Sequence, residues 1–374
     1  IAFSGISAAP RVNFRLGQST ISLKQPGGET WLKLAGLTGA TSAKGAEGTL
    51  TNASGAISAV PLLVDQASGR WRYGGGVLAL DAPSAQVRDR AINRRFEPVM
   101  ARSVHLALKQ GVITGKAVLA HPPNGKQLAL LSLTHDLSSS RGNAVLDVPK
   151  LVFGDDLQPE ALTPLTLGII ANTGGAITGK GNIRWSSAGV TSDGVFETDG
   201  IGVSAAFGQV HNIKGRIVFD DLLGMTTPPG QMVTIGEMNP GVSVKDGVIR
   251  YQLLPEQHVQ VEGGQWPFAG GELFLEPTML DFSKPSNRIF ALTVKGLDAA
   301  QFIQQFDFKN FAVTGLFDGR LPLVFDAHGG RIVGGRLVSR KEGGTLAYVG
   351  EVSDAALGGA GKMAFDALKS MKYN

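Results

Sequence analysis

The sequence of 374 residues contains no cysteine. Disulfide bonds, thiolate metal sites and cysteine nucleophiles are therefore all excluded. The absence is compatible with an oxidising compartment, where an unpaired thiol is a liability, but it does not establish one. Metal-ligand spacing is missing as well, because no two histidines form an HxxxH pattern. The histidines are His105, His121, His135, His211, His258 and His328. The sequence predicts neither a metal nor another cofactor.

The motifs of common enzymes are also missing. There is no GxSxG nucleophile elbow and no phosphate-binding loop. The segment GKGNIR at 179–184 begins like a dinucleotide fingerprint, but Arg184 stands where the third glycine is required. Adjacent titratable residues occur at His135–Asp136, Asp155–Asp156 and Asp220–Asp221. Neighbours on a strand point to opposite faces, so such pairs do not act together. We predict that the protein is not an enzyme.

Long hydrophobic runs are absent. No segment approaches the roughly 18 apolar residues that a membrane-spanning helix needs. The longest candidate, LTPLTLGIIA at 162–171, contains a proline and two threonines. No secretory signal opens the chain, and Ile1 is not an initiator residue. We expect a fragment of a longer protein from which any anchor or export signal has been removed.

Charge is scarce, because charged residues make up only 18% of the chain and the net charge is +4. The basic excess lies in residues 84–116. This segment contains only two acidic residues, Asp89 and Glu97, and a larger number of basic residues. The basic residues are Arg88, Arg90, Arg94, Arg95, Arg102, Lys109 and Lys116. A solvated face and a patch for anionic lipid headgroups both fit this composition. Nucleic acid is not favoured, because no binding motif occurs.

Glycine, in contrast, is abundant at 51 residues, about twice its ordinary usage. Apolar and polar residues alternate in short segments that stop at Gly, Pro, Asn or Asp, which is the signal of β-strands. Examples are residues 76–81, 103–111, 142–153, 246–254 and 290–296. Strands of about 5 to 9 residues without long helices between them predict an all-β protein, such as a meander, sandwich or solenoid.

Two short helices interrupt this pattern. Near 298–307, Asp298 can cap the first turn, and Gln301 stands three residues later, as in a capping box. Phe302 and Phe306 extend the apolar face of this helix. The second helix is expected near 354–371. No clear linker marks a domain boundary; we place an N-terminal β region at 1–80 and a β-groove region with both helices at 81–374.

Each predicted strand has one apolar and one polar face. Ile183 and Trp185 share a face, for example, whereas Arg184 lies on the other. Such a sheet has to cover its dry face with itself or with something else. If the sheet closes, the apolar residues form an ordinary core. If it curls into an open trough, they shield an acyl chain from water, at about 0.8 kcal/mol per buried CH₂. The strands alone leave both readings open.

Several longer phrases resemble a known family. The most specific is FAVTGLFDGRLPLVFDAHGGRIVGGRLVSRKEGGTLAYVG at 311–350. Others lie at 111–165, 205–231, 236–254, 265–282 and 364–373. Together they resemble the YdbH family, also described as a dicarboxylate transport domain, over most of residues 70–374. In that family the chain begins with an inner-membrane anchor and continues past the AFDALK helix, which fits a truncated sequence.

The YdbH family is similar to the TamB and YhdP proteins of the AsmA-like group and to the eukaryotic bridge-like lipid carriers. The resemblance implies an elongated, curled antiparallel sheet with an open apolar groove, in the periplasm of a diderm bacterium. Phospholipid would pass along it between the inner and outer membranes, and the full-length protein would be anchored to the inner membrane. A small outer-membrane lipoprotein of the YnbE type would add strands to an exposed sheet edge.

The groove lining is predicted from the apolar faces of the strands. The hypothetical lining residues are Ile183, Trp185, Ile217, Phe219, Ile249, Tyr251, Leu253, Val259, Val261, Leu273, Leu275, Leu292, Val294, Leu321, Leu323, Phe325, Leu346 and Tyr348. The helix with Asp298, Phe302 and Phe306 is expected to cap the groove, and Gly334 and Gly335 are expected inside a strand, where they ease the curl. The alternatives are a closed β-rich envelope scaffold and a dicarboxylate-binding module. The apolar wall disfavours the second, which needs converging Arg or Lys.

Overall fold

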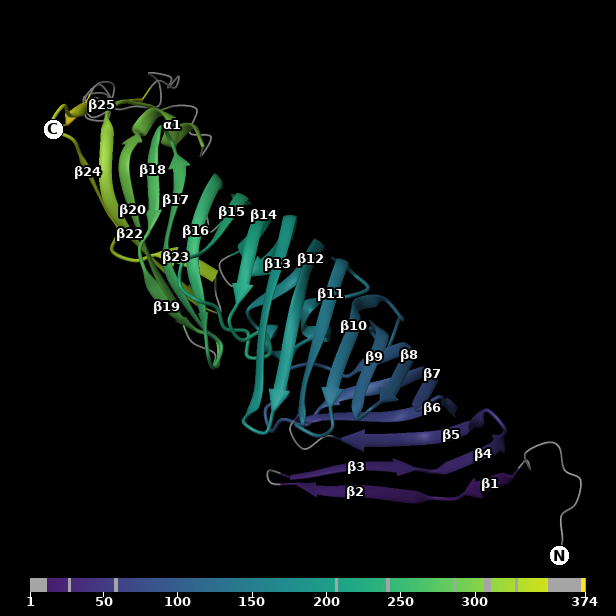
Figure 1. Ribbon diagram of the computed structural model, residues 1–374. Coiled ribbons are helices and arrows are strands. Elements are labelled where there is room, and N and C mark those ends of the chain that lie inside the picture. Colours follow the sequence, from purple (N-terminus) through teal and green to yellow (C-terminus); the bar gives the residue numbers. More distant parts are fainter. Residues whose placement is uncertain are drawn as a thin grey trace, which may run out of the picture. The chain divides into compact units, whose positions relative to one another are not determined.

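The computed structural model describes residues 12–25, 28–56, 60–205, 208–239, 243–284, 287–305, 311–326, 329–348 and 371–373. Most of these residues are in strands, with one α-helix, α1 (Ala299–Gln304), and two 3-10 turns, η1 (Pro159–Ala161) and η2 (Pro164–Thr166). The predicted all-β class is therefore confirmed (Figure 1).

The first half of the chain contains β1 (Asn13–Leu16), β2 (Ser19–Gln25), β3 (Gly28–Leu34), β4 (Gly36–Ser42), β5 (Gly45–Ala56), β6 (Leu62–Gly74), β7 (Val77–Asp89), β8 (Val99–Lys109), β9 (Val112–Ala120), β10 (Gln127–Asp136), β11 (Arg141–Phe153), β12 (Ile170–Ser186) and β13 (Gly189–Ala205). The second half contains β14 (Gly208–Phe219), β15 (Gln231–Met238), β16 (Val244–Leu254), β17 (His258–Phe268), β18 (Gly271–Leu275), β19 (Thr278–Asp281), β20 (Arg288–Asp298), β21 (Phe311–Val313), β22 (Leu316–Asp326), β23 (Gly329–Ile332), β24 (Arg336–Ser339), β25 (Gly344–Tyr348) and β26 (Met371–Tyr373).

The strands form one antiparallel sheet of 23 strands and a second sheet of β21, β25 and β26. From β5 to β12 each strand pairs with its neighbours in sequence, as in a meander. The sheet starts with β2 on β3 and β1 on β4, and it finishes with β23 and β24, which both pair with β22. No pairing between described strands joins these two ends, so the sheet is open.

The chain forms two compact units. Unit 1 comprises Ile1–Ile201 and Arg216–Pro228, and unit 2 comprises Gly202–Gly215 and Pro229–Asn374. β13 and β14 contribute residues to both units, and each unit has hydrophobic clusters of its own. The boundary predicted near residue 80 falls within β7, and the division into 1–80 and 81–374 stays a prediction.

Several strands are much longer than predicted. β12 and β13 have 17 residues each, so the expected length of about 5 to 9 is wrong for them. The reason is that glycines inside these strands do not end them. At Gly179 of β12, an added Cβ would lie only 2.5 Å from Cδ1 of Phe196 on β13. Glycine here makes room for a neighbouring ring instead of turning the chain.

Long strands are bent by bulges with left-handed residues. Asn52 of β5 (φ 44°) and Ser103 of β8 (φ 48°) lie where the register of unit 1 shifts. Gly263 of β17 (φ 142°) and Gly296 of β20 (φ 68°) do the same in unit 2. A bulge bends its strand and increases the local twist. Each unit is therefore built from curved, rather than flat, strands.

Tryptophan rings lie over glycines of the sheet. The ring of Trp266 on β17 covers Gly247 of β16 and Gly264 of its own strand, where an added Cβ would lie 2.7 Å from Cη2. In unit 1, an added Cβ on Gly39 would lie 2.5 Å from Cζ2 of Trp71. Without a side chain on the glycine, a large ring can lie flat on the backbone of the sheet.

The predicted helix near 298–307 is present as α1, and Asp298 caps it. The Asp298 side chain accepts a hydrogen bond from the backbone N–H of Gln301, at 3.0 Å. The reciprocal half of the capping box is absent, because the Asp298 N–H donates to Ala269 O at 2.8 Å. Phe302 packs edge-on against Phe268, with ring centroids 6.0 Å apart.

Other helix and glycine predictions have different outcomes. Phe306 lies outside the described residues, and so does the predicted helix near 354–371, except for Met371, which begins β26. The placement of Gly334 and Gly335 inside a strand is wrong. They lie in the break between β23 and β24, where Gly334 adopts φ 70°. The left-handed backbone interrupts the ladder at this point.

Candidate functional site

In unit 2, the strand register aligns apolar residues of successive strands. One row consists of Ile249, Gly264, Leu275, Leu292 and Leu321, from β16 to β22. The next row consists of Trp266, Leu273, Val294, Gly319 and Leu337, from β17 to β24. Residues directly opposite each other on paired strands share a face. We call the face with these rows the inner face of unit 2 and the opposite one its outer face.

The inner face of unit 2 is largely packed. Its two hydrophobic clusters both contact Leu275 and Leu292, so they are continuous. Val294 is fully buried and Trp266 is 1% exposed. The predicted lining residues on this face are Ile249, Tyr251, Leu253, Val259, Val261, Leu273, Leu275, Leu292, Val294, Leu321, Leu323 and Phe325. The structure brings them together, and their role in binding lipid stays a prediction.

Tyr251 is the polar exception among them. Burial raises the pKa of its phenol to about 12. The side chain is therefore neutral at physiological pH, and its ring lies on the apolar face without introducing a charge.

Sequence reasoning missed three large residues of the inner face, Trp266, Phe268 and Phe290. The first two follow Gly263 and Gly264, and strands of this sequence are expected to stop at glycine. The strand instead continues through both glycines, with a bulge at the first and the Trp266 ring over the second. The alternation in QWPF was the signal that could have found them.

Leu346 and Tyr348 are not brought to this face by strand pairing. They lie in β25 of the smaller sheet, opposite Val313 and Phe311 of β21. Leu346 is half-buried. Their alternation resembles that of the other lining residues, but their register joins them to a different sheet.

Unit 1 has an apolar row of its own. It consists of Tyr73, Leu78, Leu108, Ile113, His135, Gly142 and Trp185, from β6 to β12. Ile183, a predicted lining residue, packs in a cluster with Trp185 and Val60. We call this the inner face of unit 1. Trp185 and His135 are 9% and 5% exposed, whereas Leu78 and Tyr73 are 39% and 52% exposed.

The other predicted lining residues of unit 1 lie on β14. Phe219 is buried and packs edge-on against Phe196, with ring centroids 6.0 Å apart. Ile217 lies two residues earlier and therefore on the same side of the strand. It is half-buried.

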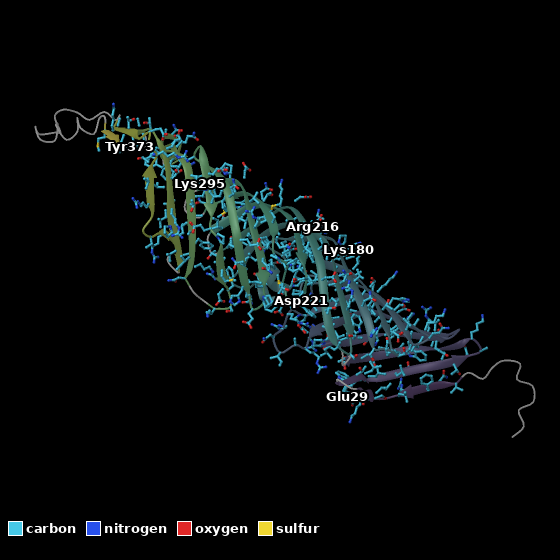
Figure 2. All side chains as sticks on the ribbon, turned by 60° about the vertical axis from the view of Figure 1, so that its left-hand side comes forward. Glu29, Lys180, Arg216, Asp221, Lys295 and Tyr373 are labelled. Carbon is cyan, nitrogen blue, oxygen red and sulfur yellow. The ribbon has the colours of Figure 1, made fainter. Side chains whose placement is uncertain are left out.

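The outer faces carry ion pairs. On unit 2, Arg320 donates two hydrogen bonds of 2.8 Å to Glu276, which also accepts one from Thr293. These bonds lower the pKa of Glu276 to about 2. On unit 1, Arg216 lies 3.4 Å from Glu197. Arg216 and Lys295 both belong to these polar faces (Figure 2). The outer faces thus hold paired charges, although Ile289, Met232 and Met279 are exposed apolar residues on the outer face of unit 2.

The basic segment at 84–116 is partly neutralised within the fold. Arg95 forms a bidentate pair with Asp89, at 2.9 and 3.0 Å, and Arg94 lies 2.8 Å from Glu97. Arg88 pairs with the buried Asp65. Arg102 donates to Gly125 O at 3.1 Å. These internal partners reduce the charge left for anionic headgroups, so this segment is a weak candidate for a lipid-surface patch.

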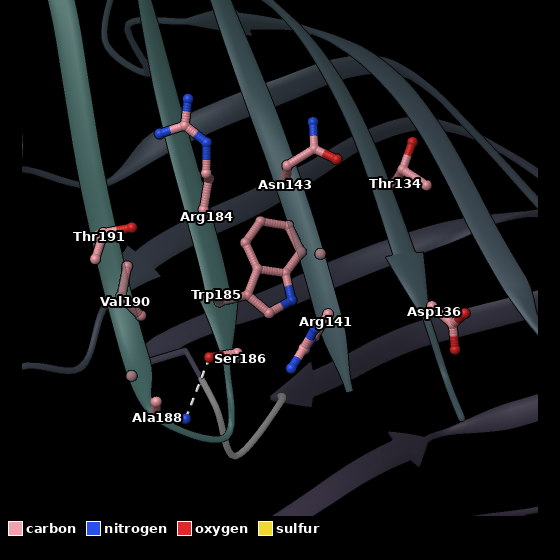
Figure 3. Close-up of a pocket in the computed structure, with 12 residues that line it drawn as sticks. Thr134, Asp136, Arg141, Asn143, Arg184, Trp185, Ser186, Ala188, Val190 and Thr191 are labelled. Atoms are coloured by element: carbon pink, nitrogen blue, oxygen red, sulfur yellow. Dashed lines mark hydrogen bonds between the residues drawn. The ribbon is translucent and has the colours of Figure 1, made fainter. Parts of the chain in front are cut away.

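A pocket of about 500 Å³ lies beside Trp185 (Figure 3). The Trp185 ring covers Gly142 of β11, and the pocket lining also includes Arg141, Arg184 and Asp136. Arg184 is already paired with Asp193. Because Asp136 adds a negative charge, the pocket does not offer the converging, uncommitted cations that a dicarboxylate requires.

Beneath this pocket, Trp185 Nε1 donates a hydrogen bond to Nδ1 of the buried His135, at 3.1 Å. Burial lowers the pKa of His135 below its usual 6.5. The accepting nitrogen has to stay unprotonated for this bond to form. The adjacent Asp136 ends β10, and its carboxylate accepts hydrogen bonds from the N–H and the hydroxyl of Ser138.

Because His135 is buried, we expect the folded protein to lose stability in mild acid. The unfolded chain takes up a proton at His135 as the pH falls below about 6.5, before the folded chain does. The stabilisation is therefore complete above pH 6.5 and is lost as the pH falls toward the lower folded pKa. We expect the urea midpoint of unit 1 to fall between pH 7.5 and pH 5.5, and to fall less in His135→Gln, whose amide oxygen can still accept from Trp185. An equal fall in both proteins would contradict this role.

No group of three or more His, Asp or Glu side chains in the described ranges is placed to hold a metal ion. No helix in the same ranges is long and apolar enough to cross a membrane.

Comparison with known proteins identifies a family. The family model described as "YdbH-like: Intermembrane phospholipid transport protein YdbH" matches residues 3–374. No curated protein and no solved structure matches significantly. The family is one of lipid transport and is not a known family of enzymes. Since the match covers almost the whole chain, the protein belongs to the YdbH-like family, whose members are described as intermembrane phospholipid transport proteins.

Proposed function

We propose that the protein carries phospholipid as a bridge, with acyl chains held against the inner faces of its sheet and headgroups left in water. This proposal rests on the change in side-chain exposure along the apolar row of unit 1. The row is covered at Trp185 and His135 but is open at Leu78 and Tyr73. A row that is covered at one end and uncovered at the other leaves contiguous apolar surface available to an apolar ligand. The open end supports an acyl-chain site over a filled scaffold.

Further exposed residues on the inner faces support the same proposal. Leu32 is 41% exposed, although Leu34, on the same side of β3, is buried. Ile21 lies opposite Leu32 and is 63% exposed. In unit 2, Ile332 lies opposite the buried Leu323 and is 52% exposed. Apolar side chains left uncovered beside a packed core are what an apolar ligand would contact.

The mechanism would be passive. Burial of hydrocarbon contributes about 0.8 kcal/mol per CH₂ and is not directional. An acyl chain can therefore move from one apolar row to the next without losing specific bonds. α1 would cap part of the inner face of unit 2, since its Phe302 packs on Phe268.

Location and partners form part of the same proposal. A carrier between two membranes works in the aqueous space between them, which is the periplasm of a diderm bacterium. We infer anchoring to the inner membrane and strand addition by a small outer-membrane lipoprotein. β24 would offer an edge for such addition, because β22 is its one partner among the described strands.

The test replaces exposed inner-face residues with a charge. In Leu32→Asp and Leu78→Asp, we expect at least a tenfold loss of the phospholipid that copurifies with the wild-type protein, because an anion next to the acyl chain has to be desolvated. The thermal midpoint should change little, since both sites are already exposed. Lipid extraction and mass spectrometry after gentle purification from a diderm host measure the ratio.

The matched control is Met232→Asp. Met232 is 54% exposed, but it lies opposite Arg250 on the outer face of unit 2. This variant should retain its lipid. A wild-type protein that is stable and free of lipid would favour the closed scaffold, and equal lipid loss in the control would show that the two faces do not differ.

A further inference from the structure

Arg288 is a charged residue on an apolar face. It is the first residue of β20 and lies opposite Phe325 of β22. Alternation along β20 places it on the inner face of unit 2, on the same side as Phe290 and Leu292. A guanidinium group stays charged throughout the physiological pH range. A cation on an apolar face has to be stabilised by an anion or by hydrogen-bond acceptors.

The contacts of Arg288 leave one donor unused. Its Cζ lies 4.5 Å from the ring centroid of Phe282, in a cation–π contact. Phe282 packs in turn on the cluster that contains Phe290, Leu323 and Phe325. The ring covers one face of the guanidinium and accepts no hydrogen bond from its in-plane N–H groups. Nε is buried and has no hydrogen-bond partner among the described residues.

The nearby carboxylate is already occupied. Asp281 accepts hydrogen bonds from the Ser283 N–H at 2.9 Å and from its hydroxyl at 2.5 Å. It also lies 3.3 Å from Lys284 Nζ and 3.7 Å from His258 Nε2. No carboxylate among the side chains that the structure describes forms an ion pair with Arg288. Arg320 on the outer face differs, because Glu276 accepts hydrogen bonds from two nitrogens of its guanidinium group.

We propose that Arg288 binds the phosphate group of a phospholipid at the rim of the inner face of unit 2. The proposal rests on the function proposed above and identifies where a headgroup would be held. A phosphate diester can accept two parallel hydrogen bonds from one guanidinium. Acyl chains attached to that phosphate would reach the adjacent Phe290 and Leu292. A lipid is favoured over free phosphate because the cation borders an apolar cluster.

The experiment separates the headgroup from the chains. The full chain is titrated calorimetrically with dihexanoyl phosphatidylglycerol, with dihexanoylglycerol, which lacks phosphate, and with glycerol 3-phosphate, which lacks acyl chains. In Arg288→Gln we expect phospholipid affinity to fall about 10- to 100-fold, as for loss of a charge-assisted bond, with diacylglycerol affinity within about twofold. Arg288→Lys should be intermediate, since an ammonium group lacks the fork. The control Arg250→Gln removes an exposed outer-face cation and should match the wild type.

The outcomes are distinct. If the wild type binds both lipids and Arg288→Gln binds phospholipid equally well, the role of Arg288 is wrong and the proposed function stands. If the wild type binds neither lipid, the proposed function fails. Equal losses for both lipids would reveal a structural role and overturn the headgroup site. Glycerol 3-phosphate binding as tightly as phospholipid would identify a free-phosphate site instead. Should Arg288→Gln fail to fold, Arg288→Lys decides between the same outcomes.

Discussion

Gly247→Ala is expected to destabilise unit 2 by about 3 kcal/mol, the cost of overpacking a well-filled core. An added Cβ would overlap Nε1 and Cδ1 of Trp266, whose side chain is 1% exposed and has little room to move. The backbone of Gly247 is not in the left-handed region, so the effect is steric. Hydrogen exchange of β15–β17, followed by mass spectrometry, measures the loss within unit 2.

Two further variants isolate this contact. Gly174→Ala, inside β12, adds a Cβ with no atom within 4 Å and should cost little. In a Trp266→Leu background, Gly247→Ala should cost much less than in the wild type, because the overlapping ring is gone. A full cost in both backgrounds would show that Trp266 is not the obstacle.

Leu323→Asp is expected to destabilise unit 2 by about 4 kcal/mol, because an unpaired carboxylate would replace a core side chain. Leu323 is 6% exposed and belongs to the cluster with Phe290 and Phe325. A loss of lipid in this variant would therefore reflect unfolding of the sheet as well as any loss of lipid contact. Urea unfolding monitored by hydrogen exchange of β20 and β22 measures the effect. Val324→Asp, which changes the outer side of the same strand, should be much milder.

The pH dependence of this loss has a definite sign. Burial raises the pKa of a carboxyl group, so the folded Leu323→Asp protein would bind its proton at a higher pH than the unfolded chain. Its stability relative to the wild type should fall as the pH rises through the unfolded pKa, about 3.9, toward the raised folded value. A deficit that is equal at pH 4 and pH 8 would be evidence against burial of the new carboxylate.

The choice of test sites depends on burial, which alternation does not reveal. Leu32 and Leu323 look equivalent in the sequence, since each is an apolar residue in an alternating strand. In the structure Leu32 is 41% exposed and Leu323 is 6% exposed. A charge at Leu32 therefore tests lipid contact, whereas a charge at Leu323 tests the stability of the core.

The ends of the strands are a second feature that the alternation of residues did not predict. Gly263 and Gly264 look like a turn, but they lie inside β17, where they permit a bulge and make room for Trp266. Gly334 and Gly335 look like strand residues, but they separate β23 from β24. The conformation of a glycine depends on which atoms pack over it. Those atoms belong to residues outside the local sequence pattern.

The sequence by itself determined the all-β class, the division of most strands into an apolar and a polar side, the absence of cysteine chemistry and the family. These follow from local properties, because successive side chains of a strand point to opposite faces. Only the tertiary structure decided the register, the burial of each apolar residue and the pairing of each charge. Arg320 meets Glu276 across 44 positions of sequence, whereas Arg288 meets the ring of Phe282. Such contacts depend on which strands become neighbours, and the period-two alternation carries no information about that.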